Sequence, residues 1–396
     1  MQPCDKIPVL LLTGYLGSGK TTLLNRILSN RKGIRFAVIV NDIGEVNIDA
    51  ELIQKGGVVA QQDDNLVALQ NGCICCSLKM DLVQQLRDLC AANTFDYIVI
   101  EASGICEPAP IAQTIASYTS MVPASSAPVP QLDAVVSVVD ALRLRDEFMV
   151  QLADLSNVSD RSDLSELVIN QIEFCNLILL NKVSEVSEEE RKHIRAIIRA
   201  IQPKAKIIDC DYCDVPFGEI LDTELFDFEE VATSAAWIQG VEGDVEEEHD
   251  HHHEHHHNHH HECDDPHCHC HNHGDEYGIT TFVYYRRKPF DLNRFDEFVA
   301  RHWDKGIIRC KGMCYFEDEY DMCYLFEQAG KQFDLKQAGT FYATMPEEEL
   351  MQLMARDPML QRDWDEQYGD RMQKLVFIGQ NIDRDAITKA LDDCLV

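Results

Sequence analysis

A complete phosphate-loop motif is the feature that most constrains the fold of this chain: residues Gly14–Thr21 read GYLGSGKT, which satisfies G-x-x-x-x-G-K-T. A β-rich apolar run precedes the motif and a helical pattern begins at Lys20, which is the context that the motif needs. Gly14 and Gly19 let the backbone turn its N–H groups toward phosphate, and the helix N-terminus adds positive potential. The chain is therefore predicted to hold a nucleoside triphosphate in an α/β domain.

Residues around this loop are predicted to bind the nucleotide and Mg²⁺ and to catalyse hydrolysis of the triphosphate. Lys20 should reach the β- and γ-phosphates, and Thr21 should ligate Mg²⁺. Glu101 ends a buried strand, where an unused carboxylate is costly, so it is predicted to hold a magnesium-bound water while Gly104 approaches the γ-phosphate. Lys20 and Glu101 are the predicted catalytic residues. The predicted nucleotide-binding residues are Gly14, Gly17, Ser18, Gly19, Lys20, Thr21, Thr22, Gly104, Asn181 and Lys182, and the predicted magnesium ligands are Thr21, Asp42 and Glu101.

Residues 1–240 alternate short apolar runs with helical patterns, which is typical of a mostly parallel sheet covered on both faces. Helices are expected to start at Lys20, Asp81 and Glu188, the last with Ser187 and Glu190 at capping-box spacing. The segment Ser120–Pro130, rich in Ser, Ala and Pro, is predicted to be a loop. The predicted strands are Val9–Thr13, Phe36–Val40, Tyr97–Glu101, Ala134–Val139 and Leu177–Leu180.

Asn181-Lys182 follows a predicted strand and matches the start of the N-K-x-D guanine motif of GTPases. The aspartate that would accept the N1 and N2 hydrogens of guanine is absent, because Ser184 stands in its place. Guanine is still favoured over adenine, with Asn181 and Lys182 lining the base and Glu185 as a candidate substitute acceptor. An ATP-using kinase or ligase stays open, although no second-substrate site is evident.

Three cysteines, Cys73, Cys75 and Cys76, lie within four residues in the run GCICC. Thiolates select soft or borderline ions such as Zn²⁺ or Cu⁺, and three ligands leave the tetrahedral shell of zinc incomplete. An incomplete shell suits a metal that must be passed on. A disulfide between the adjacent Cys75 and Cys76 would be strained, which favours free thiols at these positions. The sequence therefore predicts a zinc site at the three cysteines.

Residues 241–276 consist almost entirely of His, Asp, Glu and Cys, and are predicted to form a disordered metal-binding linker. Imidazoles bind Zn²⁺, Ni²⁺ or Cu²⁺, so metal storage or delivery is favoured over a solvated linker with incidental affinity. The predicted ligands are His249, His251, His252, His253, His255, His256, His257, His259, His260, His261, His267, His269, His271 and His273.

The acidic segment Asp42–Asp49 follows the second predicted strand, where a switch segment would meet the γ-phosphate and Mg²⁺. Its acids are equally compatible with turn residues and a helix cap. The composition narrows the possible classes of protein: a net charge of −33 argues against a nucleic-acid-binding face, and no apolar run reaches the length of a membrane span. Its 16 cysteines in 396 residues are not a secreted disulfide framework, and no signal peptide is convincing, so we expect a cytoplasmic protein.

Residues 277–396 show a second periodic region that is predicted to be a smaller α+β, ferredoxin-like domain in β-α-β-β-α-β order. Cys310, Cys314 and Cys323 lie on its predicted strands and are expected to be buried apolar cysteines rather than metal ligands. Its predicted strands are Ile279–Tyr285, Ile307–Phe316, Met322–Glu327 and Lys374–Ile378, and its predicted helices are Phe290–Trp303, Glu347–Trp364 and Asp383–Leu395.

The runs GYLGSGKTT, NDIGEVNID, GCICC, EASGICEP and NK together resemble the CobW-type metallochaperone GTPases, relatives of the nickel-insertion GTPases that serve urease and hydrogenase. The resemblance covers nearly the whole chain and implies GTP-dependent delivery of a metal, most often zinc, to a client protein. Cofactors implied are GTP, Mg²⁺ and Zn²⁺. Three positions depart from the pattern: Asp42 stands for the usual Glu, and Glu107 and Ser184 each stand for an Asp.

We expect a switch in which GTP and Mg²⁺ order the acidic segment and the linked cysteine run, and hydrolysis releases the metal. Hydrolysis should be slow, because neither an arginine finger nor a glutamine is evident in the switch region. Expected partners are a client metalloprotein and a second copy of the chain. The alternatives are cobalt or nickel insertion, as for corrinoid synthesis, and a zinc buffer with a vestigial nucleotide site.

Overall fold

The computed structural model describes residues 6–29, 33–41, 66–71, 79–121, 128–148, 162–232, 235, 277–330, 332–355, 360–361 and 364–396. The chain divides into two compact units, Met1–Ala236 with Ala329–Gln332, and Trp237–Gln328 with Phe333–Val396. The acidic segment Asp42–Asp49, the run GCICC and the histidine-rich residues 241–276 lie outside the described residues. In the part of the chain that is described, no helix has both the length and the apolar character that crossing a membrane requires.

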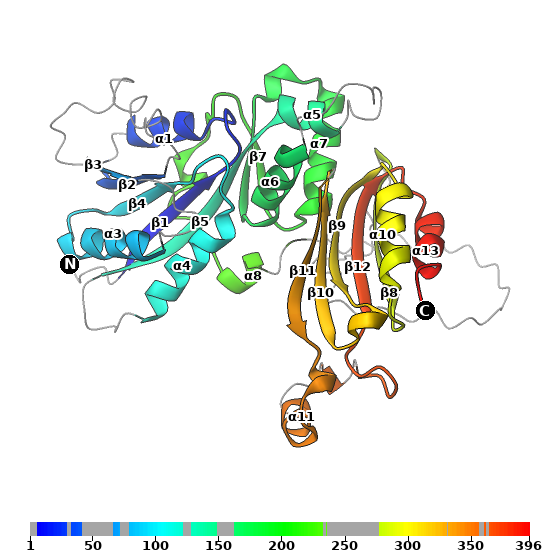
Figure 1. Ribbon diagram of the computed structural model, residues 1–396. Coiled ribbons are helices and arrows are strands. Elements are labelled where there is room, and N and C mark those ends of the chain that lie inside the picture. The colour runs from blue at the N-terminus through cyan, green and yellow to red at the C-terminus, as the bar shows by residue number, and fades with distance from the viewer. Residues whose placement is uncertain are drawn as a thin grey trace, which may run out of the picture. The chain divides into compact units, whose positions relative to one another are not determined.

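The first unit is built on a parallel sheet of seven strands in the order β3-β2-β4-β1-β5-β6-β7 (Figure 1). This confirms the predicted α/β class. The strands are β1 Lys6–Thr13, β2 Phe36–Asn41, β3 Leu66–Asn71, β4 Tyr97–Glu101, β5 Val129–Asp140, β6 Leu177–Asn181 and β7 Lys206–Asp209. The helices are α1 Lys20–Ser29, α3 Lys79–Ala92, α4 Pro108–Met121, α5 Ala141–Phe148, α6 Ser162–Glu173, α7 Glu188–Ile201 and α8 Phe228–Ala232, with short 3₁₀ turns η1 Val183–Glu185 and η2 Phe217–Glu219.

Both faces of this sheet are covered, which is why its central strands read as continuous apolar runs. One face packs against α1 and the segment 210–221, with Leu10 and Leu12 of β1 facing Leu23 and Ile27 of α1 in one core cluster. Helices α3 and α4 contact each other, and Figure 1 shows them together in front of the sheet. All five residues of β4 and of β6 are buried.

Several sequence predictions need correction in the first unit. The predicted loop Ser120–Pro130 is shorter, because α4 continues to Met121 and β5 begins at Val129. Strands β3 and β7 and helices α4, α5 and α6 were not predicted. The predicted capping box is confirmed: the Glu190 N–H donates to Ser187 Oγ at 3.2 Å, and the Ser187 N–H donates to Glu190 Oε2 at 2.7 Å.

Strand pairing brings the carboxyl ends of the parallel strands to one edge of the sheet, where ligands bind in open α/β folds. Glu101 at the end of β4 is in register with Leu12 of β1 and Val40 of β2. Asp140 of β5 is in register with Asn181 of β6. The phosphate loop begins directly after β1, so the polar strand ends and the loop share this edge.

The second unit contains an antiparallel sheet in the order β11-β10-β9-β12-β8, one strand more than the sequence pattern indicated. Strand β12 lies antiparallel to both β8 and β9. Every residue of β11 except the first is exposed, so the strand lacks the buried apolar run by which the other strands were recognised. The elements are β8 Ile279–Arg286, α10 Leu292–Arg301, β9 Ile307–Cys314, β10 Met322–Ala329, β11 Gln332–Thr340, α11 Glu347–Met354, β12 Gln373–Gln380 and α13 Arg384–Asp392, with 3₁₀ turns η4 Glu317–Glu319 and η5 Tyr342–Thr344.

Aromatic rings dominate the core of the second unit. Phe295 of α10 stacks on Phe290 with ring centroids 5.0 Å apart and meets Phe326 of β10 edge-on at 5.2 Å. Cys310 and Cys314 are fully buried in this core, as expected for apolar cysteines, and burial raises the pKa of both thiols. Helix α11, Glu347–Met354, confirms the first half of the predicted helix Glu347–Trp364; in the second half, residues 360–361 are helical, and 356–359 and 362–363 lie outside the described residues.

Candidate nucleotide site

The phosphate loop connects β1 to α1 and lies against the neighbouring strand β5. Its turn is closed by the Ser18 N–H, which donates to the Tyr15 carbonyl at 3.2 Å. Gly14 has φ +134°, and a Cβ there would lie 2.3 Å from the Val138 carbonyl oxygen. Only glycine fits this backbone conformation and this close approach, so the first glycine of the motif fixes the loop against β5.

The predicted catalytic residues and the first helical turn meet at the base of this loop. Lys20 is 7% exposed, and its Nζ donates to the Tyr15 carbonyl at 3.3 Å. Thr21 Oγ1 donates to Glu101 Oε1 at 3.0 Å, and Glu101 is 2% exposed. A hydroxyl and a carboxylate held together supply the oxygen ligands that Mg²⁺ prefers. The donor chemistry of this pair therefore fits the predicted magnesium site.

A second loop, residues 103–106, packs tightly on the phosphate loop. A Cβ on Gly104 would lie 2.7 Å from the backbone nitrogen of Leu16. The buried side chain of Gln171 on α6 donates from Nε2 to the carbonyls of Gly104 and Cys106, each at 3.2 Å. Gln171 thereby holds the loop after Glu101 in contact with the phosphate loop.

We expect Gly104→Ala to lower the free energy of unfolding by about 1–3 kcal/mol, because the added methyl would collide with the backbone nitrogen as well as the side chain of Leu16. The displaced phosphate loop should also bind GTP more weakly. Urea unfolding and titration with a fluorescent GTP analogue measure the two effects. Gly218→Ala is the matched control, since a Cβ at Gly218 meets no atom within 4 Å. Equal behaviour of the two variants would contradict this account.

Asn181 links the phosphate loop to the loop that follows β7. Its side chain is 2% exposed. Nδ2 donates to the Ser18 carbonyl at 2.8 Å, and Oδ1 accepts the Cys213 N–H at 3.0 Å. Gly19 makes this link possible, because a Cβ there, at φ +118°, would lie 2.5 Å from Asn181 Nδ2. Both ends of the Asn181 amide thus serve the architecture of the site.

Lys182 and Ser184 lie beside this link. Lys182 has φ +62° and forms an ion pair with Asp140 at the end of β5. Ser184 donates from its backbone N–H at 3.0 Å and from Oγ at 2.8 Å to Asp211 Oδ1. Sequence reasoning missed Asp211, which lies in the run Cys210-Asp211-Tyr212-Cys213. The sequence contained one signal for a site residue here: this run follows a short apolar stretch, as the other loops of the site do.

The two cysteines of this run were also missed as parts of the site. Cys210 Sγ lies 3.8 Å from Asn181 Oδ1, and Cys213 Sγ lies 3.4 Å from the Gly19 carbonyl oxygen. Both are buried, and the thiol of Cys213 has a raised pKa, first because of its hydrogen bond with Cys210 and then because of burial. These thiols pack the loop after β7 onto the phosphate loop.

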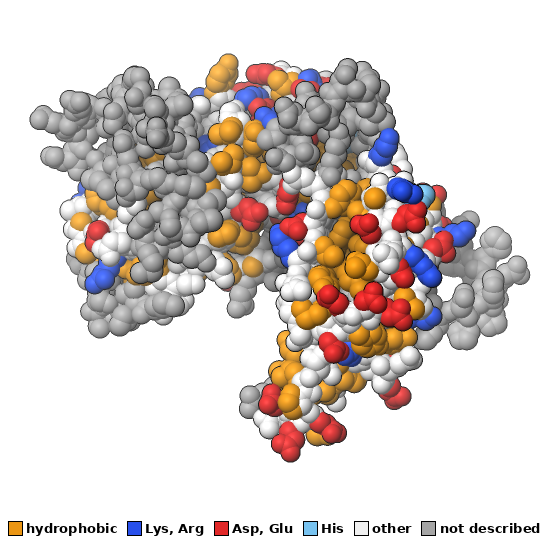
Figure 2. All heavy atoms as spheres, viewed as in Figure 1, with side chains coloured by type: hydrophobic (Ala, Val, Ile, Leu, Met, Phe, Trp, Pro, Cys, Tyr) orange, Lys and Arg blue, Asp and Glu red, His pale blue; other side chains and the backbone are white. Residues whose placement is uncertain are grey.

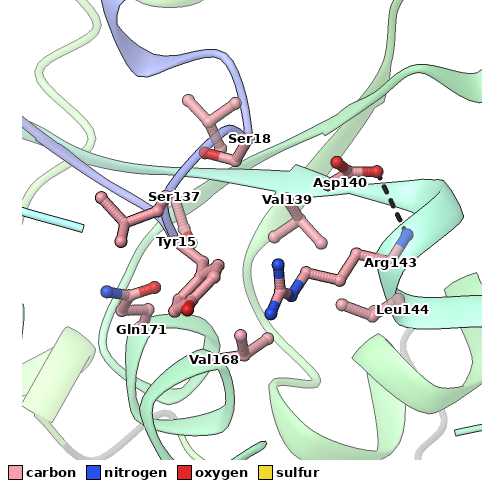
Figure 3. Close-up of a pocket in the computed structure, with 11 residues that line it drawn as sticks. Tyr15, Ser18, Ser137, Val139, Asp140, Arg143, Leu144, Val168 and Gln171 are labelled. Carbon is pink, nitrogen blue, oxygen red and sulfur yellow. Dashed lines mark hydrogen bonds between the residues drawn. The ribbon is translucent and has the colours of Figure 1, made fainter. Parts of the chain in front are cut away.

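A small recess lies beside the phosphate loop, lined by residues of that loop, β5, α5 and α6 (Figure 3). The guanidinium of Arg143 sits 3.9 Å from the centroid of the Tyr15 ring, and the Arg143 backbone N–H donates to Asp140 Oδ1 at 3.1 Å. The hydroxyls of Ser18 and Ser137, both buried, have no hydrogen-bond partner among the described residues. The phosphate loop is therefore flanked by polar groups on this side as well.

Thr22, also predicted to bind the nucleotide, is an exposed residue in the first turn of α1. The other predicted site residues lie outside the described part of the chain: Asp42, Cys73, Cys75, Cys76 and the histidines of residues 241–276. Within the described ranges, no group of three or more His, Cys, Asp or Glu side chains is placed to hold a metal ion. The predicted zinc ligands stay a prediction. The described residues do bring together Gly14, Gly17, Ser18, Gly19, Lys20, Thr21, Glu101, Gly104 and Asn181 around one loop.

Comparison with known proteins finds two family models along the chain. "CobW/HypB/UreG, nucleotide-binding domain" matches residues 8–209, and "Cobalamin synthesis protein cobW C-terminal domain" matches residues 279–395. The chain is 33% identical to the zinc-regulated GTPase metalloprotein activator 1 of Dictyostelium discoideum, over 99% of this chain and 80% of that protein. It is 34% identical to the zinc chaperone YjiA of Escherichia coli, over 58% of this chain and 65% of that protein.

Proposed function

Because the chain belongs to the CobW/HypB/UreG family of nucleotide-binding proteins, we propose that it is a GTP-hydrolysing zinc metallochaperone that transfers its metal to a client metalloprotein. The Dictyostelium relative, which aligns with 99% of the chain, is named as a zinc-regulated GTPase. The relative in Escherichia coli is named as a zinc chaperone. These names support GTP as the nucleotide and zinc as the cargo.

One observation carries the link between nucleotide and metal. Glu101, which contacts Thr21 beside the phosphate loop, ends β4, and β4 pairs with β2. The last residue of β2, Asn41, is in register with Asn71, the last residue of β3. In the sequence, Asp42 follows the end of β2 directly and Cys73 comes two positions after the end of β3. The acidic segment therefore follows β2, the neighbour of the strand that carries Glu101, and the cysteine run follows β3, the strand next to β2 on its other side.

The described residues support separate roles in binding the phosphates and in binding Mg²⁺. Lys20 would provide a positive charge to the β- and γ-phosphates, and the backbone N–H groups of the phosphate loop would surround them. Thr21 and Glu101 would hold Mg²⁺, directly or through water. When bound, Mg²⁺ would neutralise negative charge that develops on the phosphates during transfer to water.

Zinc enters this scheme as cargo. Three thiolates from Cys73, Cys75 and Cys76 leave one position of a tetrahedral shell for a ligand of the client. GTP binding strengthens this site and hydrolysis weakens it, and linkage then requires that zinc alter nucleotide affinity or turnover in return. The histidines of residues 241–276 would raise the local zinc supply, with an affinity that falls as imidazoles protonate near pH ~6.

The test is GTP turnover at fixed Mg²⁺, measured for the wild type and for Cys75→Ala with and without Zn²⁺. Zinc should change wild-type turnover, and the change should be lost in Cys75→Ala because a three-thiolate site loses one ligand. Cys394→Ala is the matched control: this cysteine is buried in the second unit and donates to the Ala390 carbonyl at 3.2 Å.

An identical zinc response in Cys75→Ala and wild type would show that the cysteine run is not coupled to the nucleotide. No turnover at all, together with several weakly bound zinc ions per chain, would favour the zinc-buffer alternative. Parallel titration with Co²⁺ and Ni²⁺ separates zinc delivery from cobalt or nickel insertion.

A further inference from the structure

Guanine and adenine differ in the hydrogen-bonding pattern of their Watson–Crick edges. Guanine presents two neighbouring donors, N1–H and the N2 amino group, whereas adenine presents an acceptor at N1. An ionised carboxylate only accepts hydrogen bonds and therefore selects guanine, but a hydroxyl both donates and accepts and selects neither. With Ser184 in the N-K-x-D position, the sequence motif alone leaves guanine without its acceptor.

A carboxylate nevertheless lies beside Ser184 in the fold, and it comes from the loop that follows the neighbouring strand, β7. Asp211 Oδ1 accepts two hydrogen bonds from Ser184, at 3.0 Å from its backbone N–H and 2.8 Å from its Oγ. The pairing of β6 with β7 sets this proximity: the Cys210 N–H donates to the Leu180 carbonyl at 2.9 Å, and the Val183 N–H donates to the Cys210 carbonyl at 3.3 Å.

The backbone that presents Asp211 is held in an unusual turn. Tyr212 and Cys213 have φ of +52° and +54°, and the Asp214 N–H donates to the Asp211 carbonyl at 3.0 Å. Left-handed conformations cost non-glycine residues on the order of 1 kcal/mol each, so they persist only where the surroundings enforce them. Here Asn181 enforces the turn by accepting the Cys213 N–H at 3.0 Å.

The side chains of this turn differ in their exposure. Cys213 is 1% exposed and packs against the phosphate loop, whereas Tyr212 is 76% exposed. Asp211 is partly exposed and lies beside Ser184. Among the described residues, the hydrogen bonds of Asp211 use Oδ1, and none involves Oδ2. Oδ2 and the remaining lone pair of Oδ1 are thus the acceptors that this loop offers to a ligand.

We propose that Asp211 is the guanine-specificity residue of this chain, and that Ser184 is its positioning residue. Relative to the N-K-x-D pattern, the acceptor comes from the loop after β7, and the hydroxyl of Ser184 stands where the pattern has its aspartate. The carboxylate accepts the N1 and N2 hydrogens of guanine and repels the N1 lone pair of adenine. This inference rests on the proposed function, because it assigns the base specificity of the same nucleotide site.

Equilibrium binding of GTP, ATP and xanthosine triphosphate, with Mg²⁺ and without zinc, tests the proposal. In Asp211→Asn, the affinity for GTP should fall about 10- to 100-fold, because charge-assisted hydrogen bonds to the base are lost. Xanthine carries a carbonyl where guanine carries its amino group. An asparagine amide can donate to that carbonyl and accept N1–H, so Asp211→Asn should prefer xanthosine triphosphate to GTP.

Asp214→Asn is the matched control, since it removes the same charge from the same turn. Its carboxylate is 75% exposed and pairs with Arg26 at 2.8 Å, away from Ser184. This variant should keep the wild-type order of affinities. The double variant Ser184→Asp, Asp211→Ser restores the N-K-x-D pattern with both side chains retained, and it should bind GTP in preference to ATP and xanthosine triphosphate.

Wild-type preference for GTP that persists unchanged in Asp211→Asn would overturn the assignment of Asp211 and leave the proposed function intact. Equal wild-type affinity for GTP and ATP would overturn both, because no guanine specificity would exist to explain. If Asp211→Asn does not fold, the double variant decides: loss of the preference for GTP in this restored arrangement also contradicts the proposal.

Discussion

Replacing Lys20 by alanine is expected to lower kcat for GTP hydrolysis about 10²- to 10³-fold, the usual effect of removing one preorganised group that stabilises transition-state charge. Lys20 is 7% exposed, and its Nζ is directed back to the loop at the Tyr15 carbonyl. Water therefore screens this ammonium group poorly, and its charge acts strongly on a γ-phosphate held by the loop. Single-turnover hydrolysis at saturating GTP measures the effect on the chemical step.

Two further variants define the role of Lys20. Lys20→Arg keeps the charge, but the larger planar guanidinium does not match the space of a buried ammonium group, so most of the activity should still be lost. Lys192→Ala removes an exposed lysine that pairs with Glu188 at 3.5 Å on α7, and it should leave kcat within about twofold of wild type. Wild-type kcat in Lys20→Ala would exclude the Lys20 ammonium group from catalysis.

The second large effect is expected for Asn181→Ala, which should lower the free energy of unfolding by about 2–4 kcal/mol. The substitution leaves the Ser18 carbonyl and the Cys213 N–H without the buried partner that they share, and each unsatisfied group costs about 1–3 kcal/mol. GTP affinity should fall as well, because the phosphate loop and the loop after β7 lose their connection. Urea unfolding followed by circular dichroism gives the change in stability.

Asn293→Ala is the control for this measurement, because Asn293 is an exposed residue on α10 and its truncation should change stability by less than about 0.5 kcal/mol. Nucleotide binding separates the local from the global effect. An Asn181→Ala protein that is as stable as wild type and binds GTP equally well would mean that the two loops hold their positions independently.

The strands that the sequence pattern missed share one property: β3, β7 and β11 each lie at an edge of a sheet. Central strands such as β4 are buried on both faces and show continuous apolar runs, which are easy to recognise. Strand β7 has only four residues, none of them buried, and β11 is exposed at nearly every position. Strands β7 and β11 therefore have little core to face, and hydrophobic periodicity does not reveal them.

The same limit explains which site residues could be predicted. Glu101 and the phosphate-loop residues follow central strands, and their spacing is local in the sequence. Asp211 meets Ser184 across 27 positions, through the pairing of β6 with the unpredicted strand β7. Contact of Asn181 with the base stays a prediction, but its amide also joins two loops, and no local spacing in the sequence indicates that connection.

Strand β11 has a consequence for how copies of this protein behave in concentrated solution. An unpaired strand edge is a template on which a strand from another molecule can add, and this leads to aggregation. Asp334 and Lys336 lie on this edge strand, and Lys336 pairs with Asp334 at 2.7 Å and with Glu327 of β10 at 3.3 Å. Figure 2 shows further acidic side chains on the visible face of the second unit. A strand added to this edge would have to bury these charges, so the exposed edge discourages sheet-to-sheet polymerisation.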